Sequence, residues 1–395
     1  MQFQRSARGR SRPAAVSLIA VCLALVSPAP AQAAAHPGPP YGDAGLQQRL
    51  EELVRAPGGP PGVIAVLRDG RHSRVVRAGV ADLETGRKPQ PQDHMRIAST
   101  AKAFSGAVAL SLVQLGDLRL DDTIGERLPQ LPRAWHAVTL RQLLNHTSGL
   151  PDYSKSPGFL SLLFADPHHR FDSRRLLDFV ADQPLLFPPG SRYQYSNSDN
   201  IAVALMAEAV TGTRYERLLA ELVYRPLGLH RTSLPQGFRM PRPYLHGYDT
   251  SPPPPPEDVS ELIGMSGVWA SGGIVSTPAD MTRFVSGYAG GRLYGPAVVR
   301  EQRRWIPGGA SEPAGPGRND AGLAIFRYTT RCGVVLGHTG NTAGYTQLIA
   351  ATPDGRRSLT FSVTSQINQT QTPDLLRLLR SVQEDFVCAL LKDKR

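Results

Sequence analysis

Residues 95–102 have the sequence Met-Arg-Ile-Ala-Ser-Thr-Ala-Lys, in which Ser99 and Lys102 form the one S-x-x-K pattern of the chain. Residues three positions apart share a face of an α-helix, so a helix that begins near Ser99 places the Lys102 amine within reach of the hydroxyl. A serine hydroxyl is a poor nucleophile until a base removes its proton, and a desolvated lysine amine can act as that base. Alone, the pattern also fits an N-capping serine followed by a solvated lysine.

The surroundings of Lys102 favour a functional amine. Only five lysines occur among the 44 basic residues of the chain, and this one lies in an apolar segment, a place where solvated charges are rare. Its apolar neighbours are Ile97, Ala98, Ala101, Ala103 and Phe104. We therefore expect Lys102 to be buried and to act on Ser99.

Two further motifs, each present once, carry polar groups suited to the same chemistry. In Tyr195-Ser196-Asn197, the phenol can relay a proton, and the amide can orient both the lysine amine and a substrate amide. His338-Thr339-Gly340 follows a predicted strand at 333–337. Such an edge can pair with an extended substrate, and glycine allows backbone and ligand to approach closely. Taken singly, each motif also fits an ordinary turn.

In this order, the three motifs resemble those of the serine penicillin-recognising enzymes. These comprise low-molecular-mass D-alanyl-D-alanine carboxypeptidases, class C β-lactamases and related esterases and peptidases. The resemblance extends from about residue 46 to 390 and includes the segments 95–99, 143–150, 271–273 and 277–280. The H-T-G triplet is more similar to the carboxypeptidase branch than to class C β-lactamases, which usually have K-T-G.

The resemblance implies a role for each catalytic residue. Ser99 would attack the carbonyl and form an acyl-enzyme, with Lys102 taking its proton. Tyr195 would assist proton transfer to the leaving amine and later activate water. Whether Lys102 or Tyr195 is the acylation base stays open, because the two are expected to titrate as a coupled pair.

The resemblance also implies substrate-binding residues. Asn197 would hold the substrate amide, and the triplet His338, Thr339 and Gly340 would line the opposite wall. The backbone N–H groups of Ser99 and Asn341 would form the oxyanion hole.

Other candidate residues rest on weaker grounds. Trp269, in a glycine-flanked loop, fits the cleft wall and the core equally well. Arg327 or Arg331 would be needed for a substrate carboxylate, although a solvated arginine is the commoner case. His146 invites a Ser-His-Asp triad, but its segment resembles a helix-ending loop and no G-x-S-x-G elbow accompanies Ser99. The histidines at 168–169 lack metal-ligand spacing, so we expect no metal and no cofactor.

The order of predicted elements favours an α/β (α+β) fold, and the resemblance implies that it is of the β-lactamase/DD-peptidase type. It consists of an antiparallel sheet flanked by terminal helices, with an inserted, mostly helical lobe. The predicted domain covers 45–392, with an α/β lobe at about 45–98 plus 305–392 and a helical lobe at about 99–304. The predicted elements are helices at 46–54, 99–115 and 372–391 and strands at 62–67, 73–79, 322–328, 333–337, 344–351 and 358–364.

The N-terminus predicts export. Residues 1–33 combine a basic start, a short apolar stretch and small residues where signal peptidase would cut, and 34–44 forms a predicted flexible leader. The apolar stretch is too short to span a membrane, and a lipoprotein anchor at Cys22 fits poorly. Removal of Cys22 leaves Cys332 and Cys388, so a disulfide is expected in an oxidising compartment, with two free thiols as the alternative.

These features predict a secreted or cell-wall-associated hydrolase. We expect a D-alanyl-D-alanine carboxypeptidase or transpeptidase that acts on cell-wall peptides and is inhibited by penicillins. A β-lactamase, an esterase or a D-amino-acid peptidase of the same fold are alternatives, and a penicillin-binding sensor with little turnover is an alternative of another class. The formal charge of +11 comes from scattered arginines without a basic run, so nucleic acid is not expected as a partner.

Overall fold

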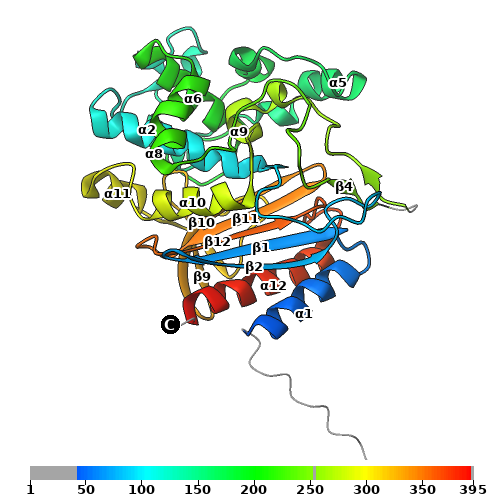
Figure 1. The fold of residues 1–395 in the computed structure, drawn as a ribbon. Coiled ribbons are helices and arrows are strands. Elements are labelled where there is room, and N and C mark those ends of the chain that lie inside the picture. Colours follow the sequence, from blue (N-terminus) through cyan, green and yellow to red (C-terminus); the bar gives the residue numbers. More distant parts are fainter. Residues whose placement is uncertain (1–41, 252–254, 393–395) are drawn as a thin grey trace, which may run out of the picture. The chain divides into compact units, whose positions relative to one another are not determined.

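An eight-stranded antiparallel sheet joins the two ends of the described chain (Figure 1), in the order β2-β1-β12-β11-β10-β9-β8-β7. The computed structural model describes residues 42–251 and 255–392. The predicted signal peptide, Cys22 and the leader up to residue 41 lie outside the described residues. The strands are β1 (Gly62–Asp69), β2 (His72–Gly79), β7 (Ile306–Pro307), β8 (Arg318–Ala321), β9 (Phe326–Thr330), β10 (Gly333–Thr342), β11 (Tyr345–Ala351) and β12 (Arg357–Val363).

The hairpin predicted near the start of the chain is present and pairs with its last strand. The turn between β1 and β2 contains Gly70 at φ +57°, a left-handed conformation that glycine adopts without steric cost. Strand β1 then pairs with β12, with Val63 opposite Val363. Contacts between residues about 300 positions apart therefore close the sheet.

Two terminal helices cover one face of the sheet, α1 (Asp43–Arg55) and α12 (Pro373–Lys392), as Figure 1 shows. Leu46, Leu50 and Leu53 of α1 are fully buried, as their helical spacing requires. On α12, the ring of Phe386 packs edge-on against Phe361 of β12 at 5.2 Å. This apolar layer fixes the sheet against both ends of the chain.

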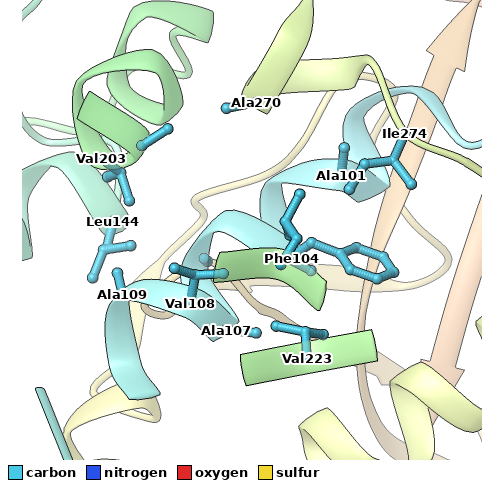
Figure 2. Packing of buried hydrophobic residues seen from close by; sticks show 14 of the residues in the cluster. Ala101, Phe104, Ala107, Val108, Ala109, Leu144, Val203, Val223, Ala270 and Ile274 are labelled. Carbon is cyan, nitrogen blue, oxygen red and sulfur yellow. The ribbon is translucent and has the colours of Figure 1, made fainter. Parts of the chain in front are cut away.

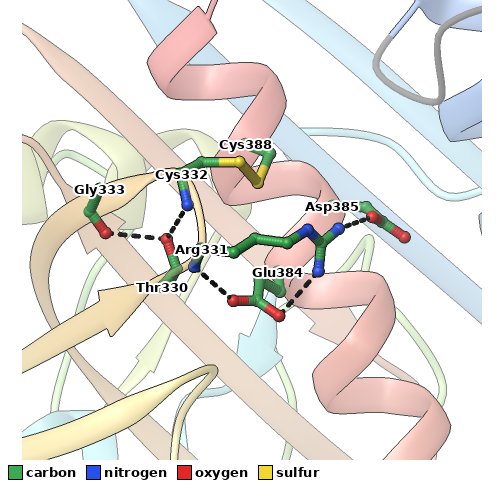
Figure 3. Close-up of a disulfide and its surroundings, with 7 residues drawn as sticks. All are labelled: Thr330, Arg331, Cys332, Gly333, Glu384, Asp385 and Cys388. Carbon is green, nitrogen blue, oxygen red and sulfur yellow. Dashed lines mark hydrogen bonds and ion pairs between the residues drawn. A yellow bond between two sulfur atoms is a disulfide. The ribbon is translucent and has the colours of Figure 1, made fainter.

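A disulfide between Cys332 and Cys388 joins the turn before β10 to α12 (Figure 3), which confirms the predicted pair. The neighbouring Arg331 binds the carboxylates of Glu384 and Asp385 on the same helix. Covalent and ionic contacts thus anchor one corner of the sheet to the last helix.

The other face of the sheet carries α10 (Pro278–Ala289), which packs on β12, β11 and β1. The remaining helices form the predicted insertion: α2 (Ala101–Leu115), α3 (Ile124–Arg127), α4 (Leu140–Leu144), α5 (Pro157–Ala165), α6 (Asn197–Thr211), α7 (Tyr215–Leu219), α8 (Arg225–Leu227), α9 (Trp269–Gly272) and α11 (Pro296–Gln302). Short helical turns are η1 (Ala98–Thr100), η2 (Arg133–Trp135), η3 (Tyr153–Lys155), η4 (Ser173–Val180), η5 (Ala220–Tyr224) and η6 (Met265–Gly267). The division into lobes at about residue 304 stays a prediction.

Helix α2 is the centre of this insertion. Its residues from Ala101 to Leu112 are all buried, so it is apolar around its circumference rather than along one stripe. Figure 2 shows Phe104 and Val108 of α2 beside Val223, and Ala109 near Leu144. A helix packed on all sides is a rigid support for the residues at its N-terminal end.

Two of the differences from the predicted strands affect the position of residues considered for the site. Residues 322–325 form a turn, not a strand, because Ala324 takes φ +54° and its N–H donates to the carbonyl of Leu144 in the helical insertion. Strand β10 does not end at Gly337 but continues pairing with β11 as far as Thr342. The H-T-G triplet therefore lies within the strand. In the described part of the chain, no helix has the length and apolar character needed to cross a membrane.

Candidate active site

Ser99 lies at the start of the central helix and faces a cleft. Strand β3 (Met95–Arg96), paired with β6 (Val275–Ser276), leads into η1, and α2 continues from it. Ala98 has φ +49°, so the chain turns sharply just before the nucleophile. The cleft has a volume of ≈ 310 Å³. It is lined by Arg96, Ala98, Ser99, Tyr153, Ser154, Tyr195, Asn197, Met265, Val268, Ser271, Gly272, Glu312, Asn341, Thr342, Gln366 and Asn368.

The amine of Lys102 lies directly beneath the nucleophile. Its Nζ is 3.1 Å from Ser99 Oγ, 2.7 Å from Asn197 Oδ1 and 2.7 Å from the carbonyl oxygen of Ser271. A neutral amine has two N–H donors and one lone pair. The oxygens of Asn197 and Ser271 can accept the two N–H groups, and the lone pair can accept the Ser99 proton.

Burial prepares Lys102 to act as a base. Its side chain is 1 % exposed, and desolvation lowers its pKa from 10.5 to about 7, against the opposing charges of Asp152, Glu312 and Asp199. A substantial fraction of the amine is therefore neutral near pH 7 and able to take the serine proton.

Tyr195 lies above the same amine. Lys102 Nζ is 5.0 Å from the centre of the Tyr195 ring, and the phenol oxygen is buried without a hydrogen-bond partner among the described residues. Burial raises the pKa of the phenol well above 10, and the Ser99 hydroxyl opposes that shift. A buried phenol with an unused donor in a catalytic cleft is suited to exchange a proton with a substrate.

Asn197, the first residue of α6, orients the lysine. Its Nδ2 donates to Asp152 Oδ2 at 3.1 Å and to Ser154 Oγ at 2.9 Å, which leaves Oδ1 to accept from Lys102. The amide is thus fixed from both sides. In this arrangement it positions the amine and has no free N–H for a substrate amide.

Strand β10 approaches the nucleophile closely at Gly340. A Cβ at this position would lie 2.5 Å from the carbonyl oxygen of Ile97 and 3.1 Å from the backbone nitrogen of Ser99. Only glycine fits there. Asn341, the next residue, lines the cleft, so the two backbone N–H groups expected to form the oxyanion hole belong to closely packed segments.

His338 and Thr339 do not line the cleft, which corrects the expectation for these two residues. His338 is fully buried, packs against Phe326, and has a pKa lowered to about 3 by burial. The Thr339 hydroxyl bonds to Ser311 Oγ and to the carbonyl oxygen of Pro313. Both side chains are buried because other segments cover them. Phe326 packs against His338, and the segment that contains Ser311 and Pro313 binds Thr339.

Trp269 also belongs to the core and not to the cleft wall. It is fully buried, packs edge-on against Tyr215 at 5.3 Å, and donates from Nε1 to Glu216 at 3.0 Å. Neither arginine considered for a substrate carboxylate lines the cleft. Arg327 binds Asp320 on the neighbouring strand at 2.7 Å, and Arg331 binds α12.

Three parts of the site were not expected from the sequence. The Ser271 carbonyl accepts from Lys102, and Asp152 accepts from Asn197. Glu312 lines the cleft. A backbone carbonyl group cannot be recognised from a sequence, and Asp152 and Glu312 belong to none of the three motifs. Among the described residues, no group of three or more His, Cys, Asp or Glu side chains is placed to bind a metal.

His146 does not join the nucleophile in a triad but forms a buried pair with Asp199, Nδ1 to Oδ2 at 2.7 Å. Asp199 also accepts from Ser148. The imidazole lies 4.5 Å from the ring of Tyr195, centre to centre. The imidazole of the pair therefore packs against the Tyr195 ring.

A serine hydroxyl held by a buried lysine amine, with an unpartnered phenol beside it, defines a serine hydrolase of the lysine-activated type. Residues 46–384 match the protein-family model described as Beta-lactamase. The chain belongs to this family.

Curated relatives carry several names. The chain is 25% identical over 305 residues to penicillin-binding protein 4* of Bacillus subtilis, a match that covers 72% of this chain and 63% of the relative. It is 32% identical over 208 residues to a D-aminopeptidase of Cereibacter sphaeroides, covering 52% of this chain and 39% of the relative. The chain thus spans under two thirds of the length of these relatives.

Solved structures are similar over more of the chain. A D-stereospecific amidohydrolase from Streptomyces sp. has a TM-score of 0.74 and 27% identity, covering 86% of this chain and 98% of the other. A D-amino acid amidase from Ochrobactrum anthropi SV3 has a TM-score of 0.75 and 24% identity, covering 87% and 97%. The predicted fold class is confirmed by these likenesses.

Proposed function

We propose that the protein is an exported serine amidohydrolase that cleaves short amides or peptides of D-amino acids through an acyl-enzyme on Ser99. The observation that carries this proposal is the Lys102 amine, which is buried, has a pKa lowered to about 7, and lies 3.1 Å from the nucleophile. The basic, apolar and small-residue pattern of residues 1–33 supports export.

The reaction has two halves. Ser99 Oγ attacks the amide carbonyl as Lys102 takes its proton, and the backbone N–H groups of Ser99 and Asn341 stabilise the oxyanion. Collapse breaks the C–N bond, and the leaving amine receives a proton through Tyr195 and Lys102. Water then attacks the ester, loses its proton to the same groups, and releases the acid and Ser99.

The choice among amide substrates rests on what the cleft presents. A D-alanyl-D-alanine carboxypeptidase must bind the carboxylate of the leaving residue, and neither Arg327 nor Arg331 faces the cleft. The likeness to the Streptomyces amidohydrolase supports an amidase or aminopeptidase instead. The carboxypeptidase stays the second candidate, favoured by the H-T-G triplet and by similarity to penicillin-binding protein 4*.

The test is intact mass spectrometry of the mature protein and of Ser99→Ala during incubation with a penicillin and, separately, with D-phenylalanine amide and D-alanyl-D-alanine. We expect a transient or stable penicilloyl adduct on the wild type alone and release of ammonia from the amide. Preferred cleavage of D-alanyl-D-alanine would favour the carboxypeptidase, and rapid consumption of penicillin would favour a β-lactamase. A stable adduct without turnover of any substrate would indicate a sensor. An adduct on both proteins would show that Ser99 is not the nucleophile.

A further inference from the structure

Glu312 is an acidic side chain held at the edge of the catalytic cleft. It is exposed and lines the cleft together with Ser99, Tyr195 and Asn341. The backbone on either side of it is anchored: the Tyr193 hydroxyl donates to the carbonyl of Ala310 at 2.6 Å. On the other side, Thr339 of the H-T-G triplet binds the carbonyl of Pro313. The buried threonine therefore holds in place the segment that carries Glu312.

The carboxylate of Glu312 has no ion pair or hydrogen bond within 42–251 and 255–392. Its charge nevertheless acts on the catalytic groups. It opposes the lowering of the pKa values of Lys102 and His146 by burial, and it adds to the rise that burial causes in the pKa of Tyr195. An unpaired acid within electrostatic reach of the nucleophile is available to a charged group on the substrate.

Among the described residues that line the cleft, few donors are available to an anionic substrate group. Of the described residues that line it, Arg96 is the one arginine, and it is 1 % exposed. Its Nε and Nη2 donate to the carbonyl oxygens of Ser260 and Phe238 at 2.9 and 2.7 Å, so that Nη1, which is buried, is the one guanidinium nitrogen without a partner among the described residues. Asp152, beside Asn197, adds a second negative charge next to Lys102. Near Glu312 a substrate carboxylate would be repelled, whereas an ammonium group would be attracted.

We propose that Glu312 binds the free α-ammonium group of the acyl residue, so that the enzyme acts on amides and short peptides with an unblocked N-terminus. The inference rests on the proposed amide hydrolysis and specifies its substrate class. Acylation would then place the ammonium group at Glu312 and the carbonyl carbon at Ser99. The leaving amine need not carry a carboxylate, so the cleft would need no group to bind one. Acetylation of the α-amine would remove the charge that Glu312 recognises.

The experiment compares kcat/KM for D-alanine p-nitroanilide and N-acetyl-D-alanine p-nitroanilide in the wild type, Glu312→Gln, Glu312→Lys and Glu257→Gln. Glu257 is exposed on β5 (Glu257–Asp258) and serves as the matched control. A charged hydrogen bond of this kind corresponds to roughly a 10- to 100-fold preference for the free amine. We expect Glu312→Gln to abolish that preference, Glu257→Gln to keep it, and Glu312→Lys to favour N-succinyl-D-alanine p-nitroanilide instead.

The outcomes separate this inference from the proposed function. Hydrolysis of both anilides with the same ratio in the wild type and Glu312→Gln would overturn the role of Glu312 alone. Hydrolysis of neither anilide by the wild type, with Ser99→Ala equally inert, would overturn amide hydrolysis and the role of Glu312 with it.

Discussion

Lys102 Nζ lies 2.7 Å from Asn197 Oδ1, and this hydrogen bond joins the start of α2 to the start of α6 across 95 residues of sequence. Because the Asn197 amide is fixed by Asp152 and Ser154, the oxygen that faces the lysine is defined. The amine is thereby held against the nucleophile. Its protonation state depends first on burial, which lowers the pKa of Lys102, and then on the nearby carboxylates, which oppose that shift.

The activity should depend on pH through Lys102. Its pKa is lowered to about 7, and the neutral amine is the base, so kcat/KM should rise with pH and level off above that value. Asp152 raises the pKa of Lys102. We therefore expect Asp152→Asn to move the rising limb to lower pH, measured with a neutral ester substrate.

The control for this profile is Asp172→Asn, an exposed acid at the start of η4. Its profile should match that of the wild type. A limb that moves to higher pH in Asp152→Asn would contradict the assignment of Lys102 as the base.

Tyr195→Phe should separate catalysis from stability. The phenol oxygen is buried without a partner among the described residues, so its removal should leave the thermal midpoint unchanged or higher. Loss of proton relay should lower kcat by roughly 10²- to 10⁴-fold. Stopped-flow acylation and steady-state turnover would measure the two halves of the reaction.

Tyr294 provides the comparison, because its hydroxyl is also buried and unpartnered in the described chain, but it does not line the cleft. Tyr294→Phe should keep full activity. Equal activity of the two variants would exclude Tyr195 from proton transfer.

The sequence predicted the local part of the site better than its surroundings. Ser99 and Lys102 meet because three residues span one helical turn, and this contact follows from spacing alone. The Asn197–Lys102 bond does not, because nothing in local sequence brings together residues 95 positions apart. The prediction that the Asn197 amide orients the lysine amine came from the hydrogen-bonding groups of an amide and not from spacing.

The errors have identifiable physical causes. Arg327 is opposite Asp320 in the register of β8 and β9, and predicting 322–328 as one strand hid this cross-strand partner. Trp269 lies in a glycine-flanked segment typical of a loop, yet its Nε1–H donates to Glu216, 53 residues away. In both cases the side chain binds an acid on another element and not a group in the cleft.

Asp199→Ala should destabilise the fold. The carboxyl group accepts from Ser148 and contacts His146, and its removal leaves the buried Ser148 hydroxyl without an acceptor and the buried imidazole without its carboxyl partner. Burial raises the pKa of Asp199 and lowers that of His146 to about 3, so the imidazole is not expected to gain charge in compensation. We expect a loss of about 3 kcal/mol in unfolding free energy, measured by urea denaturation.

Asp199→Asn should lose less, because the amide can keep one hydrogen bond to each neighbour. Asp166→Ala, at an exposed position, should change stability little. If Asp199→Ala were as stable as Asp166→Ala, the buried pair would have no structural role.

Reduction of the Cys332–Cys388 disulfide should lower stability without lowering activity. The bond closes a loop with a sequence separation of 56 residues, for which the chain-entropy model gives about 4 kcal/mol.

Cys332 precedes β10, whereas Asn341 near the other end of that strand lines the cleft. At about 3.4 Å per residue, Cys332 and Asn341 are about 31 Å apart along the strand. The double variant Cys332→Ala/Cys388→Ala should therefore unfold at lower denaturant concentration but keep the wild-type kcat/KM under native conditions. Loss of activity at a temperature where circular dichroism shows the variant folded would mean that the disulfide also shapes the cleft.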